Sequence, residues 1–468
     1  MSKTSYLAKN TLLIAISRVS TQMVMFFMLP LYTTTLTPGE YGTVDLIITY
    51  GALFAPLIML NVQQGIFRHL IDARTDSQMQ RKVITNALEI VIGTSLLAAL
   101  VFLAVSYFVD IPLIASIVFY FFSFIVGDLV VQIARGLGKT KEFAITGITQ
   151  GLLTAVLSLV FMLPLEMGMN GMLLGMAIGM LLPAIILAAY IGVYRSIKVS
   201  ARDSTIKKEL LAFSLPLMPN TISWWVFNAS DRTIISLVLG VAANGIYAVT
   251  NKFANIANSF SSIFYMSWSE SAVLAINDAD RDKFFSSVAN MMLKTFSTLG
   301  ILIMCATPVI FPLMVNESFS EALLYLPVLI LGTVFNTVVS FYSAIYVAKK
   351  LTKQVANTSI IAALINLVVI FALIWFIGIW AAAISTAVAY GAMAVYRHYD
   401  MKKYMEITYE HGLLLKLGLL FTVVTLLYYM NNAGATILSL VIAVGAGYWL
   451  NRKEMGKIKQ VVLGRITK

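Results

Sequence analysis

The sequence predicts an all-α polytopic membrane protein with about fourteen transmembrane helices. Its 468 residues are 59% hydrophobic and only 12% charged, and apolar runs recur along nearly the whole chain. A run of about 20 apolar residues is long enough to cross the hydrocarbon core of a bilayer as a helix. Because these runs are unbroken and do not alternate with polar residues, they do not suit a membrane β-barrel.

Each predicted helix is an apolar run that ends at a polar or glycine-containing turn. The first run is too long for the apolar core of a cleavable signal sequence, so we expect it to be retained as a helix. The predicted ranges are 11–36, 42–64, 83–107, 111–134, 143–163, 170–194, 211–239, 243–268, 286–313, 322–347, 355–376, 379–396, 413–430 and 434–450.

The turns between these helices alternate in charge. Of the 33 Lys and Arg residues, all but four fall in one set of turns or in the terminal segments. Positively charged loops remain in the cytoplasm, so we expect a cell-membrane protein with both termini cytoplasmic. The excess of Lys and Arg over Asp and Glu is then explained by membrane topology, and we expect no nucleic-acid partner. The other set of turns has no basic residue and carries Glu40, Asp110, Glu166, Glu317 and Glu321.

The chain contains a faint internal repeat. At an offset of 203 residues, "LTPGEYGTVDLI" (36–47) falls on "LGVAANGIYAVT" (239–250), and Gly42 meets Gly245. Farther on, an offset of 212 brings Lys141 onto Lys353. Two parallel six-helix bundles follow, with a cleft between them of the kind that transporters use. The predicted domains are the first bundle in 1–196, a basic cytoplasmic linker in 197–210, the second bundle in 211–400, and two further helices with a basic tail in 401–468.

Charged residues inside the predicted helices mark the candidate functional site. A charge at bilayer depth costs several kcal/mol, roughly 3 on insertion scales, and normally faces the bundle interior or a water-filled cavity. The basic residues in such positions are Arg18, Arg232, Lys252 and Lys294, and the acidic ones are Asp45, Glu89, Asp128 and Asp231.

Arg18, Arg232 and Lys252 are the candidates for a cationic substrate-binding cavity, because their helices occupy equivalent places in the two repeats. The neighbours Asp231 and Arg232 point about 100° apart on a helix, so they do not simply pair with each other. Either they form inter-helix ion pairs, Asp231 with Lys252 and Arg232 with Asp45, or Arg232 reaches the substrate. We favour pairs that close an external gate when the cleft faces inward.

The remaining acidic residues are candidates for a gate or for ion coupling, with structural alternatives. Glu89 and Lys294 lie near the predicted cytoplasmic surface, which favours a structural role for both. Asp128 is either a proton site or a partner of Arg135, and we favour the partner.

Other residue types add weaker expectations. Prolines can kink helices, which suits a protein that rocks between two states. The single Cys305 excludes internal disulfides and is expected to be a small buried side chain. We expect no metal site and no cofactor, and the three His residues to be solvated. Trp224, Trp225 and Trp268 are expected at lipid-facing or interfacial positions, with stacking on sugar rings as the alternative. The helix-interrupting prolines are Pro30, Pro56, Pro216, Pro219, Pro308 and Pro312.

Three stretches resemble the polysaccharide-transport family, the Wzx-type lipid-linked oligosaccharide flippases. The most specific is "LPLYT" followed by "LTPGEYG" within 9–47. "IARGLGKTKEFAITG" (133–147) looks like the central basic loop of that family. The segment 213–253, which contains the Asp231–Arg232 pair, looks like its seventh and eighth helices.

The resemblance implies a two-lobed fold shared with multidrug exporters and a peptidoglycan-precursor flippase. It implies a protein that is not an enzyme and flips undecaprenyl-pyrophosphate-linked oligosaccharide units across the cytoplasmic membrane by alternating access. Its partners would be this lipid-linked substrate, membrane lipids and the polysaccharide polymerase machinery. Two alternatives stay open: an ion-coupled multidrug exporter of the same fold, and a membrane glycosyltransferase or polymerase, which the short external turns disfavour.

The topology is testable with cysteine labelling. Because basic turns stay inside, we expect cysteines placed at Glu166 and Glu317 to react with a membrane-impermeant thiol reagent in intact cells. A cysteine at Lys207 is expected to react only after the cells are permeabilised. If only Lys207→Cys were labelled in intact cells, the predicted orientation in the membrane would be wrong.

Overall fold

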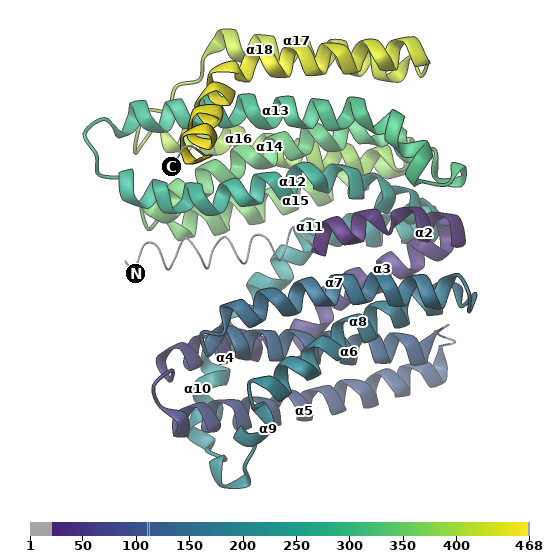
Figure 1. Ribbon diagram of the computed structural model, residues 1–468, viewed down its shortest axis with the longest axis vertical. Helices are drawn as coiled ribbons and strands as arrows, with labels where there is room; N and C mark the ends of the chain where they lie inside the picture. The colour runs from purple at the N-terminus through teal and green to yellow at the C-terminus, as the bar shows by residue number, and fades with distance from the viewer. Residues whose placement is uncertain (1–20, 110, 112, 467–468) are drawn as a thin grey trace. The chain divides into compact units, whose positions relative to one another are not determined.

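The computed structural model describes residues 21–109, 111 and 113–466, which fold into helices joined by turns, without a strand in these ranges. The all-α prediction is therefore confirmed. By their contacts, the residues divide into two compact units, Met1–Ala229 and Ser230–Lys468. Figure 1 shows the helices of both units in chain order. We call these the N-terminal unit and the C-terminal unit and describe each by itself.

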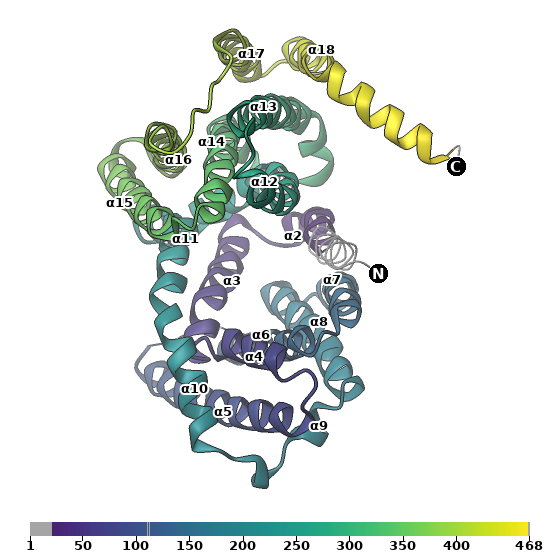
Figure 2. The ribbon, with the colours of Figure 1, turned by 90° about the vertical axis from the view of Figure 1, so that its left-hand side faces the viewer.

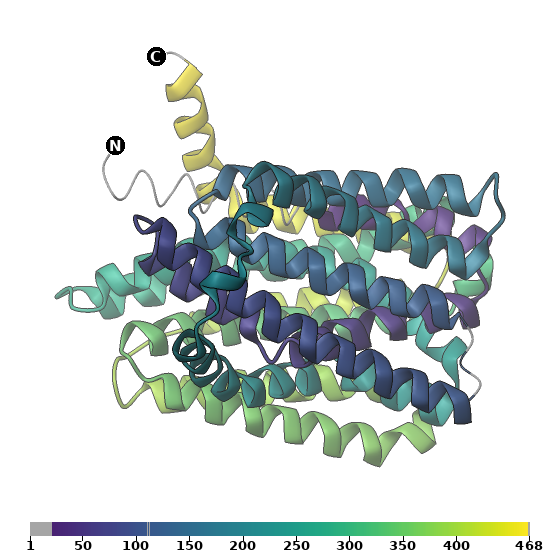
Figure 3. The same cartoon turned by 90° about the horizontal axis from the view of Figure 1, so that it is seen from below.

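The N-terminal unit contains the helices up to α10 and the first half of α11. In Figure 3 its long helices lie alongside one another. The short α10 packs against α4 and α5. Its elements are α2 (Leu29–Thr35), α3 (Pro38–Ile58), α4 (Val62–Asp72), α5 (Ser77–Phe108), α6 (Ile114–Gly136), α7 (Thr140–Met162), α8 (Gly168–Tyr190), α9 (Val193–Ser196), the 3-10 turn Val199–Ala201, α10 (Ser204–Ser214), the 3-10 turn Leu215–Leu217 and α11 (Met218–Leu239).

The C-terminal unit begins inside α11. Figure 2 looks nearly along α12, α13 and α14 and shows these three helices packed against one another. The elements of this unit are α12 (Val241–Ala275), α13 (Arg281–Met314), the 3-10 turn Glu317–Phe319, α14 (Ala322–Ala348), α15 (Thr352–Ile377), α16 (Trp380–Met401), α17 (His411–Tyr429) and α18 (Ala433–Ile466).

Ten of the described helices are long and apolar enough to cross a membrane, which makes this a multi-pass membrane protein. Three further helices, α11, α12 and α16, have spanning length but do not meet that standard of hydropathy. All three contribute to the C-terminal unit. Polar side chains on helices of this length belong on faces that avoid lipid. The first part of the predicted first helix, residues 11–20 with Arg18, lies outside the described residues.

The helix starts reproduce the internal repeat. Pro38 and Val241 begin α3 and α12, 203 residues apart, which is the first offset read from the sequence. Thr140 and Thr352 begin α7 and α15, and Gly168 and Trp380 begin α8 and α16, each pair 212 residues apart. The packing repeats as well, because α8 contacts α6 and α7 as α16 contacts α14 and α15. The two units are therefore copies of one helix arrangement.

The prediction of one helix over 42–64 is wrong at its end. The chain breaks between α3 and α4 at Leu60 and Asn61, whose φ angles are 53° and 55°. Few residues other than glycine adopt this left-handed conformation. The Asn61 amide and the Thr221 hydroxyl of α11 hydrogen bond to each other, which stabilises the break. Pro56 lies one turn before it, inside α3.

Two other predicted helices are interrupted by proline, as the sequence indicated. A turn at Met28 precedes α2, which carries Pro30 in its first turn. Pro216 lies in the 3-10 turn that separates α10 from α11, so the predicted helix 211–239 is two α-helices. Pro308 and Pro312, in contrast, lie inside the continuous α13.

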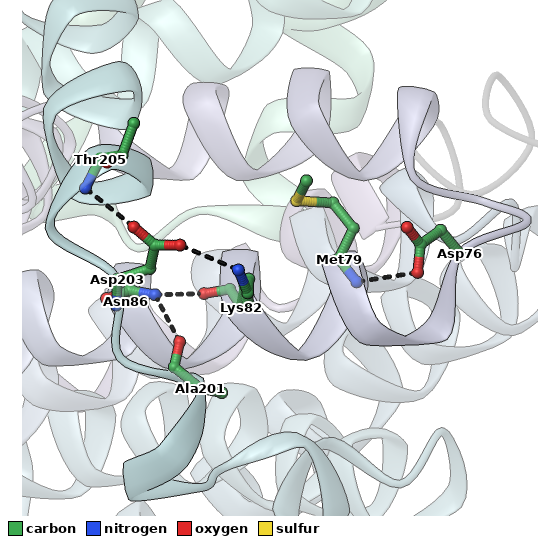
Figure 4. A network of polar contacts seen from close by, with 7 residues as sticks. All are labelled: Asp76, Met79, Lys82, Asn86, Ala201, Asp203 and Thr205. Atoms are coloured by element: carbon green, nitrogen blue, oxygen red, sulfur yellow. Dashed lines mark hydrogen bonds and ion pairs between the residues drawn. The ribbon is translucent and has the colours of Figure 1, made fainter.

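The predicted linker 197–210 is anchored on α5 (Figure 4). Asn86 is fully buried, donates to the Ala201 carbonyl at 2.9 Å and accepts from the Asp203 N–H at 2.9 Å. Lys82 donates to the Asp203 carboxylate at 2.9 Å, and this hydrogen bond is the main cause that lowers the pKa of Asp203. Asp203 also caps α10 by accepting from Thr205 N–H. The linker is therefore a structured part of the N-terminal unit.

The segment between α16 and α17 is held along α13 by a ladder of side chains. Four residues of a helix rise about 6 Å, close to the length of two extended residues, so every second backbone N–H meets a side chain one turn farther along. This ladder attaches α17 and α18 to the C-terminal unit. The pairs are Glu406 N–H with Asp282 at 3.1 Å, Thr408 N–H with Ser286 at 3.0 Å, and Glu410 N–H with Asn290 at 3.0 Å.

Arg397, which the sequence places among the cytoplasmic loop cations, is instead buried in α16 with 1% of its surface exposed. Among the described residues, the acceptors of its hydrogen bonds lie on α14 and α15, and they are carbonyls and hydroxyls, not carboxylates. It therefore joins three helices through its guanidinium. The acceptors are the Val339 and Val355 carbonyls and the Ser343 and Thr358 hydroxyls.

Glycines let α8 approach α7 closely. A Cβ at Gly179 would lie 2.7 Å from the Thr154 Cα, and one at Gly175 would lie 2.8 Å from the Ser158 backbone nitrogen. Membrane helices use such small residues because close backbone contact replaces the hydrophobic effect as the source of attraction.

We expect Gly179→Ala to separate α7 from α8 and to destabilise the protein by about 1–3 kcal/mol, the usual cost of overpacking. The matched control is Gly93→Ala in α5, where an added Cβ meets no atom within 4 Å. Thermal inactivation in detergent measures both variants. Equal inactivation temperatures would show that the close contact does not limit stability.

We expect Arg397→Met to destabilise the C-terminal unit, because it removes the guanidinium hydrogen bonds that join α16 to α14 and α15. Hydrogen bonds that involve a charged group contribute about 1.5–3 kcal/mol each. The control is Arg81→Met, at an exposed position of α5. If both variants unfold at the same temperature in a fluorescence melt, the guanidinium network does not support the fold.

Candidate functional site

The predicted cationic residues that the structure describes lie on α11 and α12, in the C-terminal unit. Arg232 and Lys252 are both half-buried. At 1.5 Å per residue, Lys252 is about 16 Å along α12 from its start at Val241. A basic side chain at that distance is several helical turns away from the turn that precedes α12. Arg18, the third predicted cation, is outside the described residues.

Asp231 accepts hydrogen bonds from residues of its own unit, the C-terminal unit. The Tyr247 hydroxyl of α12 donates to one carboxylate oxygen of Asp231, and the Arg232 backbone N–H donates to the other at 2.9 Å. Tyr247 is buried and its backbone carbonyl accepts from Asn251 at 2.9 Å. This chain of hydrogen bonds joins α11 to α12 beside the two cations. The suggested ion pairs of Asp231 with Lys252 and of Arg232 with Asp45 stay predictions.

An asparagine stripe along α12 is the feature that sequence reasoning missed. Asn244, Asn251, Asn255 and Asn258 follow the three- and four-residue spacing of one helix face. Asn244 is fully buried, whereas Asn255 is exposed although it lies about 21 Å along the helix. Counting amides at helical spacing would have found this stripe before the structure.

The stripe is absent from the equivalent helix of the first copy. At the offset of 203 residues, the positions that match Asn251, Asn255 and Asn258 in α3 are Ile48, Ala52 and Ala55. Lys252 likewise matches Thr49, and Asp45 of α3 matches Ala248. The two copies have the same helices, but polar groups for a ligand are concentrated in the second.

Asp45, the predicted gate residue of α3, is buried with 4% of its surface exposed. The next turn of the same helix carries Thr49, whose carbonyl accepts from the Trp225 indole at 3.1 Å, and Tyr50, whose ring stacks on Trp225. These contacts join α3 to α11 within the N-terminal unit. Trp225 is half-buried, so its lipid-facing or interfacial position stays a prediction.

The favoured partnership of Asp128 with Arg135 runs through a third residue of the same helix. Gln132 lies between them: its amide N–H donates to Asp128 at 3.3 Å, and its amide oxygen accepts from Arg135 at 2.9 Å. The Arg135 guanidinium also lies 4.6 Å from the centre of the Phe67 ring. Asp128 is thus tied to Arg135 through a neutral amide, one helical turn away from each.

Glu89 and Lys294 take part in structural ion pairs, as the interpretation that we favoured for both expects. Lys207 of α10 lies 2.9 Å from the Glu89 carboxylate, and Arg202 lies 3.4 Å from it. Lys294 lies 2.7 Å from Glu454 and so connects α13 to α18. A coupling role of Glu89 has no support from these contacts.

Two further expectations about single residues are wrong. Trp268 is not interfacial but buried at 3% exposure, where it stacks on Phe341 at 4.9 Å and donates to its carbonyl. His398 is only half-exposed, and its Nδ1 lies 2.9 Å from the Tyr342 hydroxyl, so it is not fully solvated. In both cases the neighbouring helix, which sequence position does not reveal, supplies the partner. Cys305 is buried, as predicted.

Comparison with solved structures identifies the fold. The chain is similar to a multidrug resistance MATE family transporter of the MOP superfamily in its inward-facing conformation, with a TM-score of 0.67 and 13% identity over 83% of this chain and 97% of that one. It is similar to the lipid II flippase MurJ in an inward closed conformation, with a TM-score of 0.65 and 15% identity over 98% of this chain and 100% of that one.

A third similar structure is a MOP superfamily transporter from Pyrococcus furiosus, described as having a binding pocket of reverse polarity. Its TM-score is 0.57, at 14% identity over 85% of this chain and 96% of that one. At such identities the likeness shows a shared fold. A search of the curated proteins gives no significant match.

The family is shown by the sequence itself. A family model described as "Polysaccharide biosynthesis protein" matches residues 7–269, which is more than half of the chain. The matched region contains α3, the whole of α11 and the part of α12 that carries Lys252 and the asparagine stripe. The chain therefore belongs to the polysaccharide biosynthesis protein family and has the two-lobed fold of the MOP superfamily.

Proposed function

We propose that this protein flips undecaprenyl-pyrophosphate-linked oligosaccharide units from the inner to the outer leaflet of the cytoplasmic membrane by alternating access, for the synthesis of a cell-surface polysaccharide. The observation that carries the proposal is the set of cationic and amide side chains on α11 and α12. The two cations, Arg232 and Lys252, are half-buried in long helices of a chain that belongs to a polysaccharide biosynthesis family.

The chemistry of such a substrate fits these groups. A pyrophosphate needs positive charge to leave water, and an Arg guanidinium forms paired hydrogen bonds to phosphate oxygens, whereas Lys supplies a compact charge. Asparagine amides both donate and accept, as sugar hydroxyls do. Arg232 and Lys252 would hold the anionic head, and Asn255 and Asn258 lie one and two turns farther along the same helix for the sugars.

The main alternative is an ion-coupled multidrug exporter of the same fold. A site for cationic drugs would need carboxylates that remain available, but the Asp231 carboxylate accepts from Tyr247 and from the backbone. A membrane glycosyltransferase or polymerase is less favoured. The described turns at the predicted external end are short, such as the single residue between α11 and α12.

The proposal also names partners. The substrate arrives as the product of a lipid-linked glycosyl transfer on the inner leaflet, and a polymerase that joins the flipped units is the expected consumer. The pairing of Arg232 with Asp45 as an external gate remains a prediction from sequence.

Flipping by purified protein in liposomes tests the function. We expect Lys252→Met, which removes the charge but keeps the length, to lower the flipping rate at least tenfold, or about 1.4 kcal/mol of barrier. Lys252→Arg keeps the charge and should retain most of the rate. The measurement is the exposure of a polyprenyl-pyrophosphate-linked saccharide to a glycosidase that cannot enter the vesicle.

The matched control is Lys353→Met, an exposed lysine in the first turn of α15. It should flip at the wild-type rate. If Lys252→Met also does so, Lys252 does not bind the head group. If the wild-type protein moves cationic dyes and no lipid-linked saccharide, the exporter alternative holds.

A further inference from the structure

A second candidate site lies at one end of the C-terminal unit, away from Lys252. Three turns meet there: the one between α11 and α12, the one that precedes α14, and the one between α15 and α16. Between them is a pocket of about 550 Å³, within the size range of small-molecule sites. Its lining includes Ala243, Glu321, Tyr325, Gly378 and Trp380 together with aliphatic side chains of the same turns.

The polar groups of this pocket are few and are fixed in place. The Tyr325 hydroxyl donates to one carboxylate oxygen of Glu321, and the Trp380 ring packs edge-on against the Tyr325 ring with centroids 5.3 Å apart. The side chain of Glu321 is exposed, whereas Tyr325 is buried at 3% exposure. A rigid aromatic pair thus stands beside an accessible carboxylate.

The turn between α15 and α16 determines where Trp380 lies. Gly378 ends α15 with φ 58° and ψ −133°, a conformation that residues with a side chain rarely adopt. Two residues later Trp380 begins α16, so the indole is carried at the start of a rigid helix. A second contact, to the Tyr429 ring of α17 at 6.2 Å, restricts it from the other side.

The first copy of the repeat lacks these groups. From the helix starts, Trp380 matches Gly168, while Glu321 and Tyr325 match Leu113 and Ile117. An aromatic belt at the membrane surface would serve both copies equally. The cluster is therefore a feature of the second copy alone, the copy that also carries the asparagine stripe.

The three turns belong to the set without basic residues, which predicts that the pocket opens on the external side. The aliphatic lining and the aromatic rings match the C–H faces of a sugar, and the free carboxylate oxygen accepts hydrogen bonds from its hydroxyls, where a charged acceptor strengthens them. A prenyl chain could pack against the apolar lining, but it has no group that donates a hydrogen bond to Glu321.

We propose that this pocket binds a sugar of the exported saccharide on the external side, after the head group has left Lys252. The proposal rests on the proposed function, because it takes the saccharide as the cargo. It adds a site of release at which a pyranose packs on Trp380 and donates to Glu321.

Protection of an engineered cysteine tests the site. Ala243→Cys places a thiol in the pocket, and the native Cys305 is buried and should stay unlabelled. The probe is the repeat-unit oligosaccharide released by hydrolysis from the surface polysaccharide of the producing cells. We expect it to slow labelling of Ala243→Cys by an impermeant maleimide at least threefold, and Trp380→Ala or Glu321→Gln to abolish this protection.

Two controls accompany the measurement. Glu317→Cys, exposed on the turn before α14, should label at the same rate with and without saccharide. Trp375→Ala, a 72% exposed tryptophan of α15 outside the pocket, should keep the protection.

The outcomes separate this site from the proposed function. Absence of protection in a protein that still flips the lipid-linked saccharide overturns the pocket and leaves the function intact. Equal protection by undecaprenyl phosphate without sugar also overturns it, because the pocket then holds the lipid chain. A protein that protects but does not flip supports the pocket and contradicts the function.

Discussion

Hydrocarbon offers no hydrogen bonds, so every polar group inside the membrane has to find its partner within the protein. This constraint accounts for the main irregularities of the structure. The break between α3 and α4 occurs where Asn61 and Thr221 satisfy each other. The guanidinium of Arg397 is compensated by carbonyls and hydroxyls of two neighbouring helices. Asp231 is held by a tyrosine and a backbone amide. Each irregular or charged position therefore also joins two or more helices.

The same constraint bears on the residues in which the two copies differ. Both repeat one order of helices, and the helix starts still agree with the offsets of 203 and 212 residues. Where the C-terminal copy has amides, a lysine, and the Glu321–Tyr325–Trp380 cluster, the N-terminal copy has uncharged residues, most of them apolar. Polar groups on long membrane helices destabilise insertion unless they serve a ligand or a partner helix. Under the proposed function, the described part of the second unit would therefore supply the ligand groups of α12.

The polar segments that connect the helices also make specific hydrogen bonds. The segment 197–210 is bound to α5 by Lys82 and Asn86, and the segment 404–410 lies along α13 on side chains one turn apart. From their composition alone, both segments would be expected to be loops without fixed contacts. In the structure they fix where the following helices begin, so α11 and α17 are positioned from outside the apolar region.

The sequence by itself determined the helical membrane class, the repeat and the family resemblance, because these depend on apolar run length, spacing and local motifs. It also located Arg232, Lys252 and Asp231 inside helices, since a charge within an apolar run is conspicuous. Tertiary structure alone decided the partners on other helices: Tyr247 for Asp231, and α14 and α15 around Arg397. The contact of Gln132 with Asp128 and Arg135, in contrast, lies within α6 at the spacing of one helical turn, which the sequence already contains. The physical reason is that a hydrogen bond between helices depends on which faces meet, and residues that meet are separated by tens of positions in the chain. Helical periodicity gives the face of each helix, but only packing selects the neighbour toward which that face points.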